Sequence, residues 1–159
     1  MSSAPEAGIK IISRNRQASH HYHLERSFQA GVVLTGAEIK SIRANQINLQ
    51  DGFVQERDGE LWLLGVHITP YKQAGVYGYV DPLRPRKLLL HRKEIAQLIG
   101  IMRERGYTIV PTMVFLQRGR AKVEIALAKG KKDYDKRDDI AKRDSDRQLR
   151  RVVKEQRYE

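Results

Sequence analysis

The sequence predicts a mainly β protein of about six antiparallel strands, with two or three short helices inserted between them. Short runs rich in β-branched and aromatic residues recur along the 159 residues, and Gly, Pro and Asp turn signals separate them. The strand–helix alternation that a parallel sheet requires is absent. An antiparallel fold of hairpins is therefore expected.

The first 14 residues are interpreted as a flexible N-terminal arm, because they are polar apart from three isoleucines. A strand is predicted from Ser19 onward, since Tyr22, Leu24 and Phe28 share one parity. Gly31 stands where a β-bulge would bend this long strand.

A short helix is predicted after Thr35 and runs to about Ala44. Thr35 and Glu38 have the spacing of a capping box, in which the Thr35 hydroxyl accepts from a free amide and the Glu38 carboxylate bonds back to the cap. Two isoleucines one turn apart face inward. The accessible faces are expected to carry Glu38, Lys40 and Arg43, although Glu38 could equally be only a cap.

Two β-hairpins are predicted. The first joins residues 52–57 to 60–68 through Asp58-Gly59, a pair that suits a type I′ turn because both central residues need positive φ. The second joins residues 108–116 to 121–128 through a glycine-containing turn.

A proline-rich loop is predicted over residues 69–85. A helix follows over residues 91–105, where apolar residues recur at helical spacing, and Gly106 stands at its expected C-cap. A closed antiparallel barrel of the oligonucleotide-binding type over residues 15–129 is the favoured closure for these elements.

The composition changes at Lys129. The segment from Lys129 to Glu159 holds 12 Lys and Arg against 8 Asp and Glu, and few sizeable apolar residues. Such a segment cannot bury enough surface to offset the entropy of ordering it, so residues 130–159 are interpreted as a basic tail that either stays free or folds on something else. Since the net charge of the whole chain is +11, an excess of +7 belongs to the residues before the tail. Both parts therefore favour a polyanionic partner.

Several classes of function are disfavoured. Cysteine is absent, which removes disulfides, thiolate nucleophiles and cysteine-based zinc sites. The sequence shows no signal-peptide run, membrane-spanning run, amphipathic anchor or lipidation signal, so a soluble cytoplasmic protein without a membrane partner is expected. The sequence contains no glycine-rich phosphate-binding motif and no nucleophile with a recognisable partner. No enzymatic activity and no cofactor are therefore expected.

Two metal interpretations are weighed and set aside. On a strand, His21 and His23 would share one face while His20 points away, and nothing nearby completes a site. The aspartates of the tail, such as Asp133 and Asp135, lack the rigid scaffold that a two-metal nuclease needs. They are expected to pair with tail cations instead.

Candidate RNA contacts are chosen by side-chain chemistry, because cations bind phosphate while amides and rings bond to or stack on bases. The cations are Arg16, Lys40, Arg43, Arg86, Lys87, Lys122, Lys129, Lys131 and Lys132. The amides and rings are Asn15, Asn45, His67, Tyr71 and His91. For any single lysine, a merely solvated position is the alternative.

Several strings occur together in order along the chain. They are N-R-x-A from Asn15, G-x-x-L-T-G-A-E-I-K-S-I-R from Gly31, D-P-L-R-P-R-K-L-L-L-H from Asp81, G-Y-T-I-V-P from Gly106, A-K-V-E-I-A-L-A-K-G-K-K from Ala121, and D-K-R from Asp135. Over about Asn15 to Arg143, the chain resembles the SsrA-binding protein family, also called small protein B.

This resemblance implies an oligonucleotide-binding-like barrel that binds the transfer-RNA-like domain of transfer-messenger RNA and helps to rescue stalled ribosomes. The small ribosomal subunit and its RNA are direct partners, with elongation factor Tu and alanyl-tRNA synthetase as indirect ones. The resemblance further implies a tail that is disordered when free and helical in the empty messenger channel. It places on the RNA face Asn15, Arg16, Glu38, Lys40, Leu89 and Lys122. It places in the decoding region Lys131, Lys132, Tyr134, Asp135, Lys136 and Arg137.

Two positions depart from the family pattern. Gln29 replaces a glutamate that many members carry, and it can still form hydrogen bonds without the charge. Tyr134 replaces a histidine of some members, and either ring could stack on a base. The alternative function is that of a structural ribosomal protein or a general RNA-binding barrel.

Overall fold

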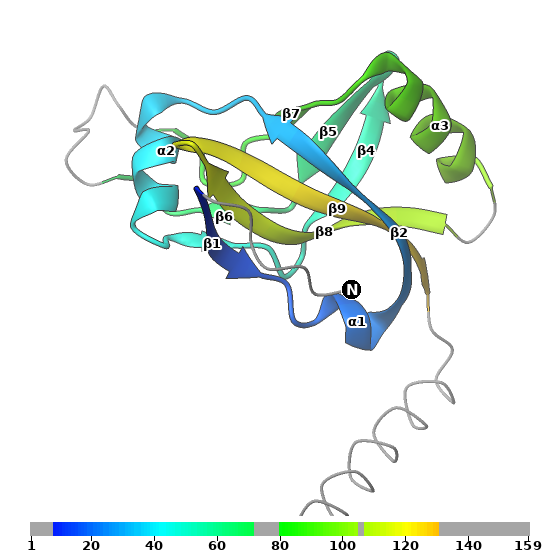
Figure 1. Cartoon of the computed structure of the whole chain (residues 1–159), viewed down its shortest axis with the longest axis horizontal. Coiled ribbons are helices and arrows are strands. Elements are labelled where there is room, and N and C mark those ends of the chain that lie inside the picture. Colours follow the sequence, from blue (N-terminus) through cyan, green and yellow to red (C-terminus); the bar gives the residue numbers. More distant parts are fainter. Residues whose placement is uncertain (1–7, 72–79, 105–106, 131–159) are drawn as a thin grey trace, which may run out of the picture.

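The computed structural model describes residues 8–71, 80–104 and 107–130. Nine strands and three helices lie in this part of the chain (Figure 1). The strands are β1 (Ile9–Arg14), β2 (Tyr22–Val32), β3 (Ile47–Asn48), β4 (Phe53–Arg57), β5 (Glu60–Leu64), β6 (His67–Ile68), β7 (Arg86–Leu89), β8 (Tyr107–Gln117) and β9 (Arg120–Gly130). The helices are α1 (Ala18–His21), α2 (Gly36–Arg43) and α3 (Arg92–Met102).

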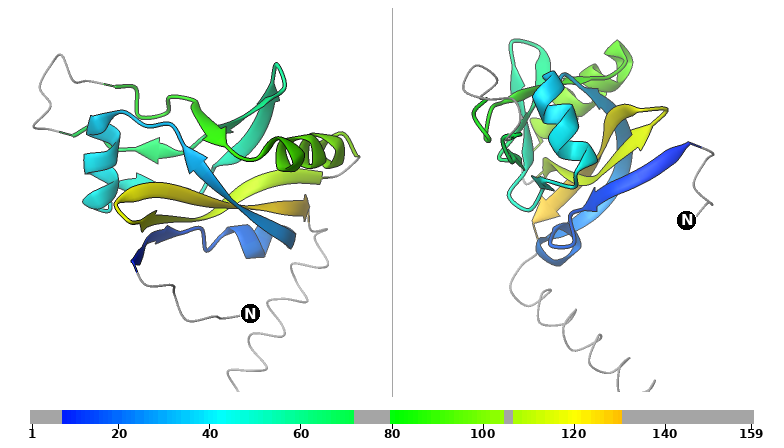
Figure 2. Two further views of the ribbon diagram at one scale, coloured as in Figure 1. Left: turned by 45° about the horizontal axis from the view of Figure 1, so that its top comes forward. Right: turned by 90° about the vertical axis from the view of Figure 1, so that its left-hand side faces the viewer.

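Seven strands form one antiparallel sheet in the order β1-β8-β9-β2-β7-β5-β4, and β3 pairs with β6 in a separate ladder. Figure 2 shows α2 and α3 at opposite ends of this curved sheet. The edge strand β4 comes into contact with β8, but among the described residues no ladder joins the two ends of the sheet. The mainly β prediction is confirmed, whereas closure into a barrel is not.

Strand β1 lies inside the segment interpreted as a flexible arm, so that interpretation is wrong for Ile9–Arg14. Its ladder with β8 runs from the pair Ile9 and Gln117 to the pair Arg14 and Met113. The isoleucines explain why this segment forms a strand and not a flexible arm, since Ile12 packs against the core while Ile11 stays exposed. Residues 1–7 lie outside the described residues.

Both predicted hairpins are present. Asp58 and Gly59 have φ values of 52° and 77°, and they join β4 to β5 as a type I′ turn requires. Arg118 and Gly119 have φ values of 52° and 78°, and they join β8 to β9. The first hairpin ends earlier than predicted, because Gly65 adopts φ 71° and separates β5 from β6.

The capping box before α2 is formed as predicted. The Thr35 hydroxyl accepts from the Glu38 amide at 3.2 Å, and the Thr35 amide donates to the Glu38 carboxylate at 2.9 Å. Helix α3 also agrees with its prediction and buries Leu98 completely. The predicted C-cap Gly106 lies outside the described residues.

Two local predictions on the N-terminal side are wrong. His20 and His21 belong to the short helix α1, which turns the chain from β1 into β2, so they do not lie on a strand. The bulge in β2 falls between Leu24 and Ser27, whereas Gly31 keeps a regular register with both neighbouring strands.

One main core fills the space between the curved sheet and the two longer helices. Its fully buried members include Ala30 of β2, Leu61 of β5, Ile109 of β8 and Ile125 of β9. Because alternate residues of a strand point to opposite faces, the other parity of β2, β7 and β9 lies on the outer face of the sheet.

Candidate nucleic-acid interface

The outer face of the sheet centres on Gly31. Gly31 pairs with Leu89 of β7 on one side and with Lys122 of β9 on the other. Residues directly opposite each other in a ladder point to the same face. The register therefore brings Leu89 and Lys122 to either side of a position that has no side chain.

Leu89 is unusually exposed for a leucine in a central strand, at 52%. A Cβ atom on Gly31 would lie 3.3 Å from the Cβ of Leu89, so the glycine leaves room for the leucine side chain. Lys122 is half-buried beside them. An exposed apolar side chain next to a lysine can pack against a ribose or base while the ammonium binds phosphate.

Gln29 and Lys87 lie on the same outer face. Gln29 is exposed and faces Glu124, whose carboxylate accepts from the Thr112 hydroxyl at 2.8 Å. Lys87 forms a salt bridge with Glu60 at 2.8 Å. We call Gln29, Lys87, Leu89 and Lys122 the outer-face cluster, and the structure brings these four predicted residues together.

A second group of predicted residues lies at the C-terminal end of α2. Lys40 is exposed, with its ammonium 5.4 Å from the centroid of the Tyr71 ring. Arg43 is also exposed and donates to the Gly119 carbonyl at 3.4 Å. Asn45 follows the helix with φ 60°. The accessible positions predicted for Lys40 and Arg43 are confirmed.

Glu38 and Arg86 are buried, at 4% and 1% exposure. Arg86 Nε donates to Glu38 Oε2 at 2.6 Å, and Arg84 donates to the other carboxylate oxygen. Arg86 also donates to the carbonyls of Val66 and Pro82. The accessible position predicted for Glu38 is therefore wrong, and the guanidinium of Arg86 is engaged inside the protein instead of being presented to phosphate.

The electrostatics of this pair follow from its burial. Burial raises the pKa of Glu38, but hydrogen bonds from Arg84, Thr35 and Arg86 outweigh that effect and hold the pKa below its ordinary value. Burial lowers the pKa of Arg86, and the Glu38 carboxylate partly offsets that shift. Both groups remain ionised at neutral pH, so the buried charges compensate each other.

Asn15, which is a predicted RNA-contact residue, also has a structural role. Its amide nitrogen donates to the carbonyls of Leu49 at 3.2 Å and Pro111 at 3.0 Å, which ties the end of β1 to two other segments. Its Oδ1 is buried without a hydrogen-bond partner among the described residues.

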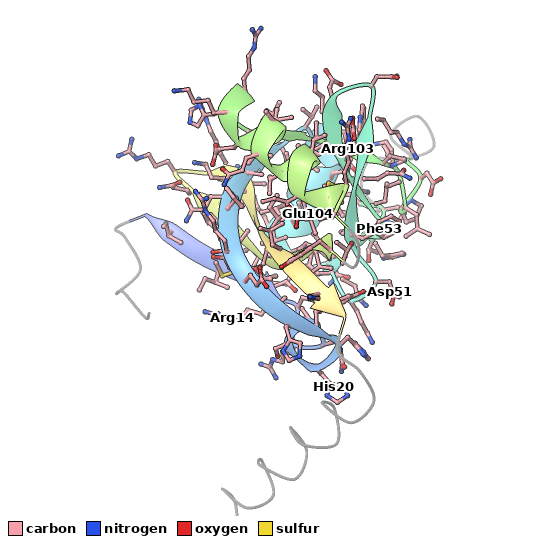
Figure 3. The ribbon with its side chains drawn as sticks, turned by 90° about the vertical axis from the view of Figure 1, so that its right-hand side faces the viewer. Arg14, His20, Asp51, Phe53, Arg103 and Glu104 are labelled. Atoms are coloured by element: carbon pink, nitrogen blue, oxygen red, sulfur yellow. The ribbon has the colours of Figure 1, made fainter. Side chains whose placement is uncertain are left out.

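Asn15 lines a groove of about 620 Å³ at the end of the sheet where β9 finishes. Figure 3 looks onto this end of the molecule, with Asp51, Phe53 and His20 labelled around the end of β9. The wall of the groove includes Gln17, His21, Tyr22, Gln50, Asp51, Phe53, Thr108 and Gly130.

The remaining predicted contacts are dispersed over the surface. Arg16 is exposed just after β1, and His67 is exposed on β6. His91 is exposed at the N-cap of α3, where its amide donates to Glu94. Lys129 is exposed near the end of β9, with its ammonium 5.6 Å from the centroid of the Tyr107 ring.

The predicted decoding residues lie outside the described residues; they are Lys131, Lys132, Tyr134, Asp135, Lys136 and Arg137. Within the described ranges, no three His, Asp or Glu side chains are grouped so that they could hold a metal ion. No helix in those ranges is both long and apolar enough to cross a membrane.

Sequence reasoning missed Arg84, the second cation on Glu38. The signal was present in the run Asp81-Pro82-Leu83-Arg84-Pro85-Arg86, because prolines on either side of a basic residue indicate a rigid segment. Its buried partner could not be identified from spacing, since Glu38 is 46 residues away.

The chain is basic and mainly β, and its outer face carries Lys87 and Lys122 beside the exposed side chains of Leu89 and Gln29. These features define the nucleic-acid-binding class of β protein. The comparisons with known proteins are more specific.

The family model described as SmpB protein matches residues 12–155, so the chain belongs to the SmpB family. The SsrA-binding protein of Roseiflexus sp. strain RS-1 is 54% identical over 146 residues, covering 92% of each chain. The SsrA-binding protein of Desulfitobacterium hafniense strain DCB-2 is 50% identical over 149 residues, covering 94% of this chain and 95% of the relative. A chain from the solved structure described as "tmRNA-SmpB: a journey to the center of the bacterial ribosome" has a TM-score of 0.64 and 41% identity, covering 80% of this chain and 87% of its own.

Proposed function

We propose that this protein binds the transfer-RNA-like domain of transfer-messenger RNA and is required to deliver that RNA to stalled ribosomes in trans-translation. The observation that carries the proposal is the register that places Leu89 and Lys122 on either side of Gly31. Membership of the SmpB family supports it, as does the likeness to a solved chain whose description names transfer-messenger RNA and the bacterial ribosome. The protein acts in the cytoplasm by binding and not by catalysis.

The RNA surface of this proposal is the outer-face cluster together with the exposed cations of α2. An exposed leucine supplies an apolar packing contact that does not depend on salt, while Lys122, Lys40 and Arg43 supply contacts to phosphate that do. Gln29 adds a neutral hydrogen-bonding group on β2, two residues before Gly31. Glu38 and Arg86 hold α2 against β7 and thereby position the surface.

The division of labour is also part of the proposal. Residues 15–129 bind the RNA, and residues 130–159 enter the decoding region and the empty messenger channel of the small ribosomal subunit. Elongation factor Tu and alanyl-tRNA synthetase act on the same RNA and are indirect partners.

Truncation after Gly130 tests this division. The truncated protein is expected to bind the transfer-RNA-like domain with the affinity of the full chain. It is also expected to fail to support peptide tagging on ribosomes stalled in vitro on a message without a stop codon. Loss of RNA binding on truncation would contradict the division, and retained tagging would contradict the role of the tail.

A further inference from the structure

Three arginines gather at the turn between β8 and β9. Arg118 and Arg120 flank Gly119 in sequence, and Nη2 of Arg43 lies 3.4 Å from the Gly119 carbonyl. Arg43 comes from α2, more than seventy residues earlier in the chain. Figure 1 shows the β8–β9 turn beside α2. The fold thus brings two distant segments together at one point, and both supply guanidinium groups.

The turn holds these arginines in a defined backbone geometry. Arg118 has φ 52° and Gly119 has φ 78°, so the turn is closed in a conformation that favours Asn, Asp or Gly at its first position. Positive φ is unfavourable for an arginine backbone, and such an unfavourable conformation is a reason to look for a functional role of the residue. The Arg118 amide also donates to the Gly8 carbonyl at 3.3 Å, which fixes the turn to the start of β1.

The charges of the three arginines are uncompensated within the described residues. All three are exposed, and none forms a salt bridge with another residue in the described ranges. By contrast, Lys87 at the other side of the outer-face cluster is paired with Glu60. The unpaired positive charge beside the outer-face cluster is therefore concentrated near the β8–β9 turn.

Arg120 continues the outer-face cluster. It lies two residues from Lys122 on β9, so the two side chains point to the same face at a separation of about 7 Å along the strand. From Lys122 the cationic surface runs through Arg120 to the turn and on to Arg43. An RNA strand that contacts Lys122 can continue along this cationic surface. Phosphates recur along the RNA backbone, and guanidinium groups bind phosphate in a bidentate manner.

We infer that Arg43, Arg118 and Arg120 form a phosphate clamp that extends the RNA surface beyond Lys122 to the β8–β9 turn. This inference rests on the proposed function, since it takes the bound RNA to cross the outer-face cluster. The clamp binds sugar-phosphate backbone and carries no base specificity.

The test compares two variants with the same change in charge. The clamp variant combines Arg118→Asn with Arg120→Gln, and asparagine is chosen because it tolerates positive φ. The control variant combines Arg57→Gln with Arg103→Gln, two exposed arginines at the β4 end and after α3. Thermal unfolding is measured for both, and the clamp variant is expected to keep the wild-type midpoint because neither side chain is buried.

The probe is the transcribed transfer-RNA-like domain, and its Kd is measured between about 50 and 200 mM salt. Loss of two phosphate contacts should weaken the binding of the clamp variant about 10-fold to 30-fold and reduce the slope of log affinity against log salt by about 1.5 to 2. The control variant should keep a slope close to that of the wild type. Adding Arg43→Gln to the clamp variant should reduce the slope by about 0.9 more.

A clamp variant whose slope matches that of the control would overturn the inference and leave the proposed function standing, provided that the wild type still prefers this RNA to an ordinary transfer RNA. A wild type without that preference would overturn the proposed function itself. The two failures are therefore distinguishable in one set of titrations.

Discussion

Glu38 Oε2 accepts a hydrogen bond from Arg86 Nε at 2.6 Å, and this buried contact joins helix α2 to strand β7. The same carboxylate closes the cap of α2 through the Thr35 amide, while Arg86 anchors the carbonyls of Val66 and Pro82. One ion pair therefore fixes the helix that carries Lys40 and Arg43 relative to the strand that carries Leu89. It positions the proposed RNA surface without belonging to it.

Glu38→Gln should destabilise the protein by about 3 kcal/mol or more, because it leaves the buried Arg86 charge without its counterion. The free energy of unfolding in urea measures the effect. Glu56→Gln is the matched control, since Glu56 lies 3.7 Å from the exposed Arg103 and should cost about 0.5 kcal/mol or less. Equal losses for the two variants would contradict a structural role for the buried pair.

The stability of the wild type should also depend on pH through Glu38. The native pKa of Glu38 is lowered from the ordinary value of 4.5, so the carboxylate stabilises the native state fully above that value. This stabilisation is lost as the pH falls below 4.5 and through the native pKa. Urea titrations at a series of acidic pH values should show a steeper loss for the wild type than for Glu38→Gln. Parallel curves for the two proteins would count against the lowered pKa.

Leu89→Ala should weaken RNA binding by about fivefold or more while changing the free energy of unfolding by about 0.5 kcal/mol or less. The leucine is already half exposed, so little apolar burial is lost. Leu83→Ala provides the control, because Leu83 is 53% exposed and Leu89 is 52% exposed. If both variants bound the RNA equally well in an equilibrium titration, Leu89 would not be an RNA contact.

Gly65→Ala should cost much more stability than Gly59→Ala, although both glycines have positive φ, of 71° and 77°. A Cβ on Gly65 would clash with the Asp51 carbonyl oxygen, whereas a Cβ on Gly59 meets no atom of the described residues within 4 Å. Gly59→Ala should therefore show only the backbone cost of about 1 to 2 kcal/mol. Urea unfolding of both variants measures the difference, and similar losses would show that the contact at Asp51 relaxes freely.

Local signals in the sequence predicted the elements that depend on neighbouring residues. Asp58-Gly59 indicated its hairpin, and Thr35 with Glu38 indicated the start of α2, because each motif satisfies its hydrogen bonds within a few residues. Strand β1 was missed because a strand of six residues pairs with β8 about a hundred positions away, which composition does not reveal.

The candidate site was predictable as a set of residue types but not as a geometry. The partners that bury Glu38 lie 46 and 48 residues along the chain, so the capping spacing could not show whether its carboxylate faces solvent. The grouping of Leu89 with Lys122 depends on the register of three strands around Gly31. Register follows from the packing of the whole sheet and not from any single stretch.

The central claim is recognition of transfer-messenger RNA, and the ratio of two dissociation constants tests it most directly. The full chain should bind the transcribed transfer-RNA-like domain of transfer-messenger RNA at least about tenfold more tightly than an ordinary transfer RNA at the same salt concentration. Comparable affinities for the two RNAs would contradict the claim and would instead favour a general RNA-binding protein.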